Sequence, residues 1–243
     1  MAVCLLLGAF FLFACGTGRR NQNEETKQKD QSLLGAESTS SMKEEIPSTG
    51  WTVVLDAGHG AADSGKVGVN GALEKDINLS IVFLLKEELE QQGVEVVLTR
   101  ESDEPLYSAS DSNKKMADMK KRIAIMEEHV PDAVVSIHQN SYPDNSVKGP
   151  QVFYYTGSSN GETLAKSIQS SFSLAVGEEN NKRQAKANGD YYLLLHTSCV
   201  CVITECGFLS NPEEAALLVT EEYQKKIAKA VAEGIMGYLK NIE

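Results

Sequence analysis

Two of the four histidines in this chain stand where a hydrophobic run stops. His59 follows the run in "VVLDAGHG", with a glycine on each side, and His138 closes the run "AVVSIH". Glu205 closes a third run, "VCVITE". If these runs are strands of one parallel sheet, their carboxyl ends share an edge, and ligands gather at such edges. Imidazole and carboxylate groups that converge there can hold a metal ion.

The glycines beside His59 agree with metal chemistry. Gly58 and Gly60 have no side chains, so they leave room beside an imidazole for an ion, a water molecule and a substrate. Asp56 is placed to bond nearby backbone or to orient the imidazole. A Gly-His-Gly turn after a strand is also common as a structural turn, so the motif predicts a metal site only together with further ligands.

Glu74 is the candidate for a further ligand. It stands in the glycine-containing loop "GVNGALEKD", where the next helix is predicted to begin. A lone carboxylate there would favour the positive end of the helix dipole and need no other role. With His59 and His138 at the same edge, Glu74 completes a His-Glu-His set that suits zinc with one open coordination position.

The order of elements explains how residues so far apart would meet. Hydrophobic periodicity predicts strands at "WTVVLD", "VEVVLTR", "AVVSIH", "QVFYY" and "VCVITE", and helices over residues 76–92, 114–129, 161–174 and 221–239. Strands that alternate with long helices favour an α/β fold, with a twisted, mostly parallel sheet that helices cover on both faces. A single catalytic domain of this kind accounts for residues 51–243.

The residues ahead of this domain differ from it in composition. Residues 1–18 are almost wholly apolar but fall short of a membrane-spanning helix of about 20 residues, so they fit an export signal. The end of this segment, "LFACG", resembles a bacterial lipoprotein signal, in which Cys15 is lipidated; an uncleaved anchor is the alternative. Residues 19–50 contain no aromatic residue and predict a disordered polar tether. Both interpretations place the domain outside the bacterial cytoplasmic membrane, tethered to its outer face.

The formal net charge of −11 argues against one class of partner. A protein that binds nucleic acid needs a basic stripe to neutralise phosphates, and the sequence has none. A substrate that is itself anionic must therefore be held by local contacts.

The other cysteines and histidines of the predicted domain are expected to have structural roles. Cys199 and Cys201 are two apart on a predicted strand and point to the same face, so they do not pair with each other, and with Cys206 they are expected in the core. His129 is expected to stabilise the C-terminal end of a helix, and His196 to lie in a surface turn.

Five segments, in this order along the chain, resemble the zinc-dependent N-acetylmuramoyl-L-alanine amidases of the amidase-3 family. They are "VVLDAGHGAADSG", "LEKDINLSIVFLLKEELEQQGVEVVLTRESD", "RIAIMEEHVPDAVVSIHQNS", "GPQVFYY" and "CVCVITECGFLSNPEEAALL", and the resemblance covers residues 51–239. It implies a twisted, parallel-rich sheet flanked by helices, in agreement with the element order. The chain departs from the family pattern at Ala61 and Ala62, where a further glycine is common, and at Cys206, where Thr, Val or Ala is usual.

The resemblance also implies roles for the site residues. His59, Glu74 and His138 match the zinc ligands of the family, and Glu205 matches its catalytic carboxylate. In that assignment zinc lowers the pKa of a water molecule, and Glu205 accepts the proton and passes it to the departing amine. The bond cleaved is the amide between N-acetylmuramic acid and L-alanine, at the head of the peptidoglycan stem peptide.

Three weaker candidates for a substrate groove lie outside this set. Asn140 follows closely after His138 and is a candidate for shaping an oxyanion pocket, or else a turn residue. Lys182 and Arg183 would offer cations to the carboxylates of a stem peptide, although cations in a polar loop are usually solvated surface.

The biological role admits several alternatives. The short tether, the lack of repeats and the segment "NGDYYLLL" most resemble the spore-cortex branch of the family, which removes stem peptides so that muramic lactam can form. A vegetative amidase of wall turnover or cell separation is the main rival. A non-catalytic wall-binding lipoprotein and a zinc carboxypeptidase are the other classes, and Glu205 argues against the first of these because mere binding does not require it.

Overall fold

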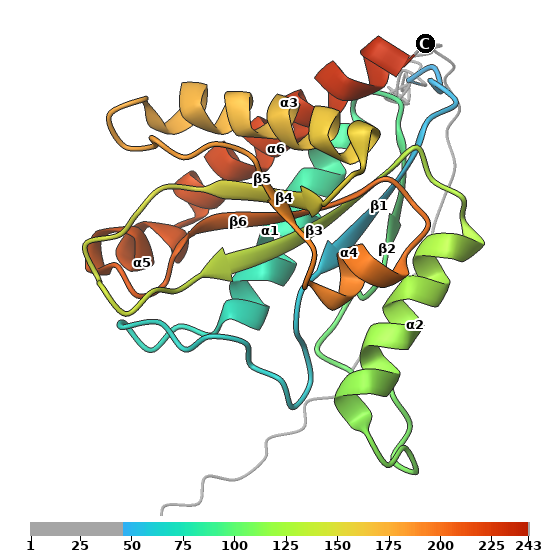
Figure 1. Cartoon of the computed structure of the whole chain (residues 1–243), viewed down its shortest axis with the longest axis horizontal. Helices are drawn as coiled ribbons and strands as arrows, with labels where there is room; N and C mark the ends of the chain where they lie inside the picture. The colour runs from blue at the N-terminus through green and yellow to red at the C-terminus, as the bar shows by residue number, and fades with distance from the viewer. Residues whose placement is uncertain (1–45, 243) are drawn as a thin grey trace, which may run out of the picture. The chain divides into compact units, whose positions relative to one another are not determined.

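The strand order brings the carboxyl ends of the central strands side by side. The computed structural model describes residues 46–242 (Figure 1), and within them six strands form one sheet in the order β2-β1-β3-β6-β4-β5. Their bounds are β1 Thr52–Ala57, β2 Glu95–Leu98, β3 Ala133–Asn140, β4 Gln151–Tyr155, β5 Lys186–Asn188 and β6 Cys201–Phe208. Strands β2, β1, β3 and β6 run parallel, and β4 runs antiparallel to β6. The predicted mostly parallel α/β sheet is confirmed.

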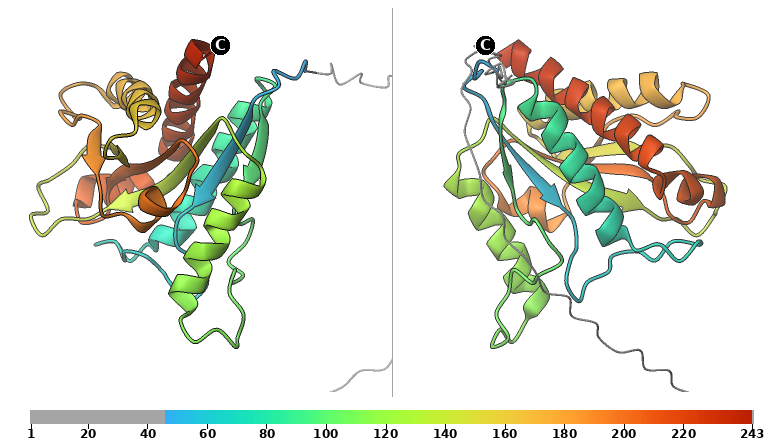
Figure 2. Two further views of the ribbon diagram at one scale, coloured as in Figure 1. Left: turned by 45° about the vertical axis from the view of Figure 1, so that its right-hand side comes forward. Right: turned by 180° about the vertical axis from the view of Figure 1, so that it is seen from behind.

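Helices cover both faces of this sheet. Their bounds are α1 Glu74–Glu90, α2 Lys114–Glu128, α3 Ser159–Val176, α4 Tyr192–His196, α5 Pro212–Leu218 and α6 Glu221–Ile242. Helices α1, α3 and α6 pack on one face, and α2 and α4 pack on the other (Figure 2). Helices α4 and α5 and strand β5 are additional to the predicted elements.

The hydrophobic run in β1 is divided between two cores. Successive side chains of a strand point to opposite faces, so Val53 and Leu55 pack with α1, α3 and α6, whereas Val54 packs with α2 and α4. All three side chains are fully buried. A strand covered on both faces needs apolar residues at every position, which explains why the run shows no alternation.

The cysteines and the two other histidines take structural positions. Cys201 and Cys206 are buried, Cys199 is half-buried, and all three are free thiols, as expected of core residues. His129 is the residue that ends α2. His196 is exposed in the last turn of α4, stacked on Tyr192 at a ring-centroid distance of 3.9 Å, instead of lying in a surface turn.

The predicted export signal over residues 1–18, with Cys15, and the predicted tether up to residue 45 lie outside the described residues. The segment that leads into β1 is joined to the domain, because Thr49 donates its backbone N–H to Gly93 at 2.9 Å. In the part of the chain that the structure describes, no helix combines the length and the apolar character needed to cross a membrane.

Candidate functional site

Three side chains from separate elements meet at the carboxyl edge of the sheet. His59 follows β1, Glu74 opens α1 and His138 lies in β3. One donor atom from each lies within 4.8 Å of the other two. His59 Nε2 is 3.2 Å and His138 Nδ1 is 3.0 Å from the same carboxylate oxygen, Glu74 Oε1. The predicted convergence of these residues is therefore present in the fold.

Glu74 is held in place as an anion. Its side chain is buried and accepts the backbone N–H groups of Lys66 at 2.7 Å and Gln139 at 3.0 Å. Burial by itself would raise the pKa of Glu74, but the hydrogen bonds with His138 and His59 outweigh it and hold that pKa well below its usual range. A carboxylate that stays ionised and faces two imidazoles suits a divalent metal ion.

The backbone at His59 is in the left-handed region, with φ of 62°, which is uncommon for a residue with a side chain. Arg122 from α2 donates to the carbonyl of His59 at 2.5 Å and to that of Ala57 at 2.8 Å. Arg100 donates to Ala57 at 2.8 Å as well. The two arginines, both buried, therefore fix the turn that presents His59.

Asp56 acts through Arg122 and makes no hydrogen bond with the imidazole. Its carboxylate accepts hydrogen bonds from Arg122 at 2.6 Å, Thr99 at 2.6 Å and Ser136 at 2.5 Å. Burial would raise the pKa of Asp56, but the guanidinium and the two hydroxyls lower it to about 2. The expectation that Asp56 orients His59 directly is thus replaced by an indirect contact, because Asp56 holds the arginine that holds the turn.

Asp63 is a site residue that the sequence analysis missed. Its Oδ2 atom lies 3.2 Å from His59 Nδ1, the ring nitrogen that points away from Glu74. A carboxylate behind a histidine ligand fixes the orientation of the ring and raises its basicity. Burial opposes the effect, but hydrogen bonds with Glu74 and Asp63 raise the pKa of His59 above its ordinary value.

Two glycines make room for the ligands. A β-carbon on Gly58 would stand 2.2 Å from the Cε1 and Nε2 atoms of His138. A β-carbon on Gly65, where φ is +64°, would stand 2.6 Å from both Glu74 Oε2 and His59 Cδ2. Gly60 serves a different purpose, since its β-carbon would approach Arg100 at 3.2 Å. Gly58 therefore makes space for His138, where the sequence suggested space for His59.

Glu205 lies in β6, where it is paired in register with His138 of β3. Its carboxyl is buried, and its Oε2 atom has no hydrogen-bond partner among the described residues. Burial raises the pKa of Glu205 to about 7 against the opposing charge of His138, and the charge of Glu74 adds to the rise. A buried, unpartnered carboxylate oxygen beside two imidazoles and an anionic carboxylate fits a site built around a metal ion and its water.

Of the groove candidates from the sequence, Asn140 is the last residue of β3, and Lys182 and Arg183 lie in the loop before β5. The side chain of Asn140 accepts the neighbouring N–H of Ser141 at 2.8 Å, as a turn residue does. Arg183 donates to the carbonyl of Lys148 at 3.0 Å and lies 4.5 Å from the ring centroid of Phe208. Lys182 lines a separate surface depression. Their part in substrate binding stays a prediction.

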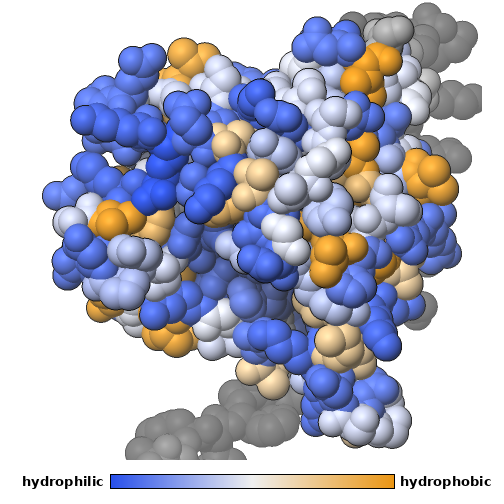
Figure 3. Space-filling view, in the orientation of Figure 1, coloured by the Kyte–Doolittle hydropathy of each residue, from blue (hydrophilic) through white to orange (hydrophobic). Residues whose placement is uncertain are grey.

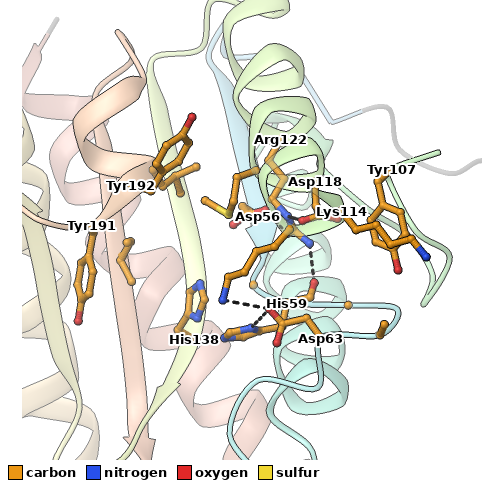
Figure 4. Close-up of a pocket in the computed structure, with 17 residues that line it drawn as sticks. Asp56, His59, Asp63, Tyr107, Lys114, Asp118, Arg122, His138, Tyr191 and Tyr192 are labelled. Atoms are coloured by element: carbon orange, nitrogen blue, oxygen red, sulfur yellow. Dashed lines mark hydrogen bonds and ion pairs between the residues drawn. The ribbon is translucent and has the colours of Figure 1, made fainter. Parts of the chain in front are cut away.

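A pocket of about 490 Å³ opens beside His59 and His138. Figure 4 shows Tyr191 and Tyr192 on one side of it and residues of α2 on the other, with the two imidazoles between them. The face of the molecule seen in Figure 3 is mainly hydrophilic, with apolar residues scattered over it. At about 490 Å³, the pocket is large enough for a substrate segment, and His59 and His138 are part of its lining.

Comparison with known proteins gives a consistent result. A sequence profile of the family described as N-acetylmuramoyl-L-alanine amidase matches residues 53–237. The germination-specific N-acetylmuramoyl-L-alanine amidase of Bacillus subtilis is 37% identical over 196 residues, which cover 79% of this chain and 81% of that protein. The amidase LytC of the same organism is 30% identical over 194 residues, or 79% of this chain and 36% of LytC.

A solved structure agrees with these sequence matches. The CwlD amidase of Clostridioides difficile, determined in complex with the GerS lipoprotein, superposes with a TM-score of 0.75 at 38% identity, covering 79% of this chain and 99% of that one.

Proposed function

The chain belongs to the N-acetylmuramoyl-L-alanine amidase family and is an amidase of peptidoglycan, and on that premise we propose that it works with a zinc ion held by His59, Glu74 and His138. The observation that carries this proposal is the convergence of the three donor atoms within 4.8 Å, beside the buried and unpartnered Oε2 atom of Glu205. Two imidazoles and one carboxylate form a common ligand set for catalytic zinc.

Glu205 is proposed as the general base. When zinc is bound, it supplies the Lewis acidity that eases deprotonation of water and polarises the amide carbonyl. Glu205 takes the proton of the attacking water and delivers it to the nitrogen of L-alanine, because an amine leaves only when it is protonated. Asp63, Arg122 and Arg100 hold His59 and its turn in position throughout, and this lowers the cost of organising the site.

The proposed substrate is the peptidoglycan of the spore cortex, where loss of the stem peptide precedes muramic lactam formation. The germination-specific amidase of Bacillus subtilis, at 37% identity, supports this role over a vegetative one. We also propose that the enzyme acts outside the cytoplasmic membrane, tethered to its outer face through residues 1–18, with Cys15 lipidated.

Digestion of purified cortex and vegetative peptidoglycan by the full chain in mild detergent tests this function. The expected products are peptides with a free N-terminal L-alanine, identified by mass, with faster release from cortex. Release of terminal D-alanine alone would identify a carboxypeptidase instead. Binding without any product would identify a wall-binding protein, and faster digestion of vegetative wall would favour the rival role.

A further inference from the structure

The pocket beside the metal ligands has an aromatic wall. Tyr191, Tyr192 and Leu193 line it where α4 begins, and His59 and His138 stand at its edge (Figure 4). Tyrosine rings offer broad apolar contact to a chain without demanding a charge. This side of the pocket suits the backbone and small side chains of a peptide.

The opposite wall, at the start of α2, carries two lysines that we call the lysine rim, Lys114 and Lys115. Both are exposed. Lys114 lies 5.6 Å from the ring centroid of Tyr107 and forms no ion pair within residues 46–242. Lys115 is 3.7 Å from Asp63, a long and exposed pair of the kind that contributes little stability. The rim therefore keeps positive charge available to a ligand.

The acidic groups around the rim are engaged by other residues. Asp118 accepts a hydrogen bond from Arg122 Nε at 2.6 Å, and Asp56 is buried against the same guanidinium. Asp63 contacts His59 through the oxygen that Lys115 approaches. The lining of the pocket thus carries three carboxylates and three cations, and Lys114 and Lys115 are its only exposed charged residues, so the rim itself is positive. A rim of this sign favours an anionic group of the substrate.

We propose that this pocket binds the stem peptide and that the lysine rim pairs with the α-carboxylate of its second residue. The inference rests on the proposed amidase function. The glycan strand next to the scissile amide is uncharged, whereas the γ-linked glutamate that follows L-alanine carries a free carboxylate unless it is amidated. The peptide side of the substrate therefore offers an anionic group to Lys114 and Lys115, whereas the neighbouring glycan does not.

The distances fit that assignment. Asp63 Oδ2 is 3.2 Å from His59 Nδ1 and 3.7 Å from Lys115 Nζ, so the rim lies one side chain away from a metal ligand. An extended peptide advances about 3.5 Å per residue. With L-alanine at the metal site, the next residue reaches the rim.

Lys182 and Arg183 are less suited to this task. Neither lines the pocket. Arg183 is held by Lys148 and Phe208, and Lys182 lies in a depression shared with Glu178 and Glu179, where the local charge is unfavourable for a carboxylate. We therefore place the contact with this carboxylate at the lysine rim and not at Lys182 or Arg183.

The test compares two substrates that differ in one group. They are disaccharide tripeptides in which the second residue carries either a free α-carboxylate or its amide. The wild-type full chain is expected to prefer the free acid on the order of tenfold in kcat/KM at low salt, because a charge-assisted contact is lost with the amide. The double variant Lys114→Gln/Lys115→Gln should bring this ratio close to one. The double variant Lys120→Gln/Lys121→Gln, on the same helix but outside the pocket, should keep it.

The outcomes separate this inference from the proposed function. If the rim variant keeps the preference, or the wild type shows none, the inference is overturned while the amidase function stands. If the wild type cleaves neither substrate, the proposed function fails and the inference fails with it. Zinc content is measured in every variant. If the rim variant loses zinc, its lost preference for the free acid comes from disturbance of Asp63 and His59, and carboxylate recognition by the rim is overturned.

Discussion

At the scale of single residues, Gly58 stands where a β-carbon would lie 2.2 Å from the His138 ring. That ring also contacts Glu74 at 3.0 Å, so it cannot turn aside without giving up the ligand geometry. Absence of a side chain is therefore as necessary to this site as the presence of the imidazoles.

Gly58→Ala is expected to weaken zinc binding by about tenfold or more, the range seen when supporting residues of a metal site are disturbed. The measurement is zinc affinity by competition with a chelator. Gly189→Ala is the matched control, because its β-carbon would meet only Thr156 Oγ1 at 3.7 Å, an ordinary contact. Equal zinc affinity in the two variants would contradict the role given to Gly58.

Glu205 gives a prediction about stability and pH in the metal-free protein. Its pKa is raised from 4.5 to about 7 in the folded protein, so the folded state holds this proton more tightly than the unfolded state does. The resulting contribution to stability is fully present below pH 4.5 and is lost as the pH rises through 7. Glu205→Gln should therefore gain stability over the wild type as pH increases, by roughly 3 kcal/mol above pH 7. Urea unfolding of chelator-treated protein between pH 4.5 and pH 8 measures this gain, and a difference that does not change with pH would refute it.

Most of the proposed site could be predicted from the sequence, because its residues lie in regular elements or directly beside them. His138 and Glu205 belong to strands, and Glu74 opens a helix. Asp63 and Gly65 could not be predicted in the same way. They lie in the turns after β1, where His59, Gly60, Ala61 and Gly65 have positive φ, and hydrophobic periodicity gives no information about such turns.

At the scale of elements, α2 is joined to β1 by a buried ion pair. Arg122 Nη1 lies 2.6 Å from Asp56 Oδ1, and both side chains are almost completely buried. Hydrophobic periodicity predicted helix α2 correctly, but it did not predict that Arg122 is buried. A charged residue is normally assigned to the solvent-exposed face unless its buried partner is known.

Arg122→Met is expected to destabilise the domain by about 3 kcal/mol or more near pH 7, because it leaves the Asp56 carboxylate buried without its cation. The loss should shrink as the pH falls and Asp56 becomes protonated. Urea unfolding measures the change. Lys225→Met, which removes an exposed pair with Glu221, serves as the control and should change stability very little, because water screens a pair on the surface. Similar losses in both variants would contradict the account of α2.

The short elements were beyond prediction for a physical reason. Strand β5 has 3 residues, α4 has 5 and α5 has 7, so none is long enough to show a hydrophobic period. Tertiary contacts define them instead. Helix α4 packs Leu193 and Leu194 into the core under the pocket, and it thereby sets the position of the tyrosine wall.

At the scale of the whole chain, the proposal is a catalytic domain held near a membrane by its N-terminal segment. The full chain should fractionate with membranes in a bacterial host, whereas a chain that begins at Ile46 should be soluble. Cys15→Ala should lose incorporation of a labelled fatty acid. If that variant carries label as well as the wild type does, the uncleaved anchor replaces lipidation as the explanation.

The most direct test of the zinc site and its base is to measure activity and zinc content together in Glu205→Gln. The exchange keeps the size of the side chain and removes its basic oxygen. If Glu205 is the base, kcat should fall on the order of a hundredfold or more, about 3 kcal/mol of barrier, with zinc content unchanged. Near-normal turnover would exclude Glu205 as the base. Loss of zinc would contradict the proposed site in another way, because it would make Glu205 a metal ligand in addition to His59, Glu74 and His138.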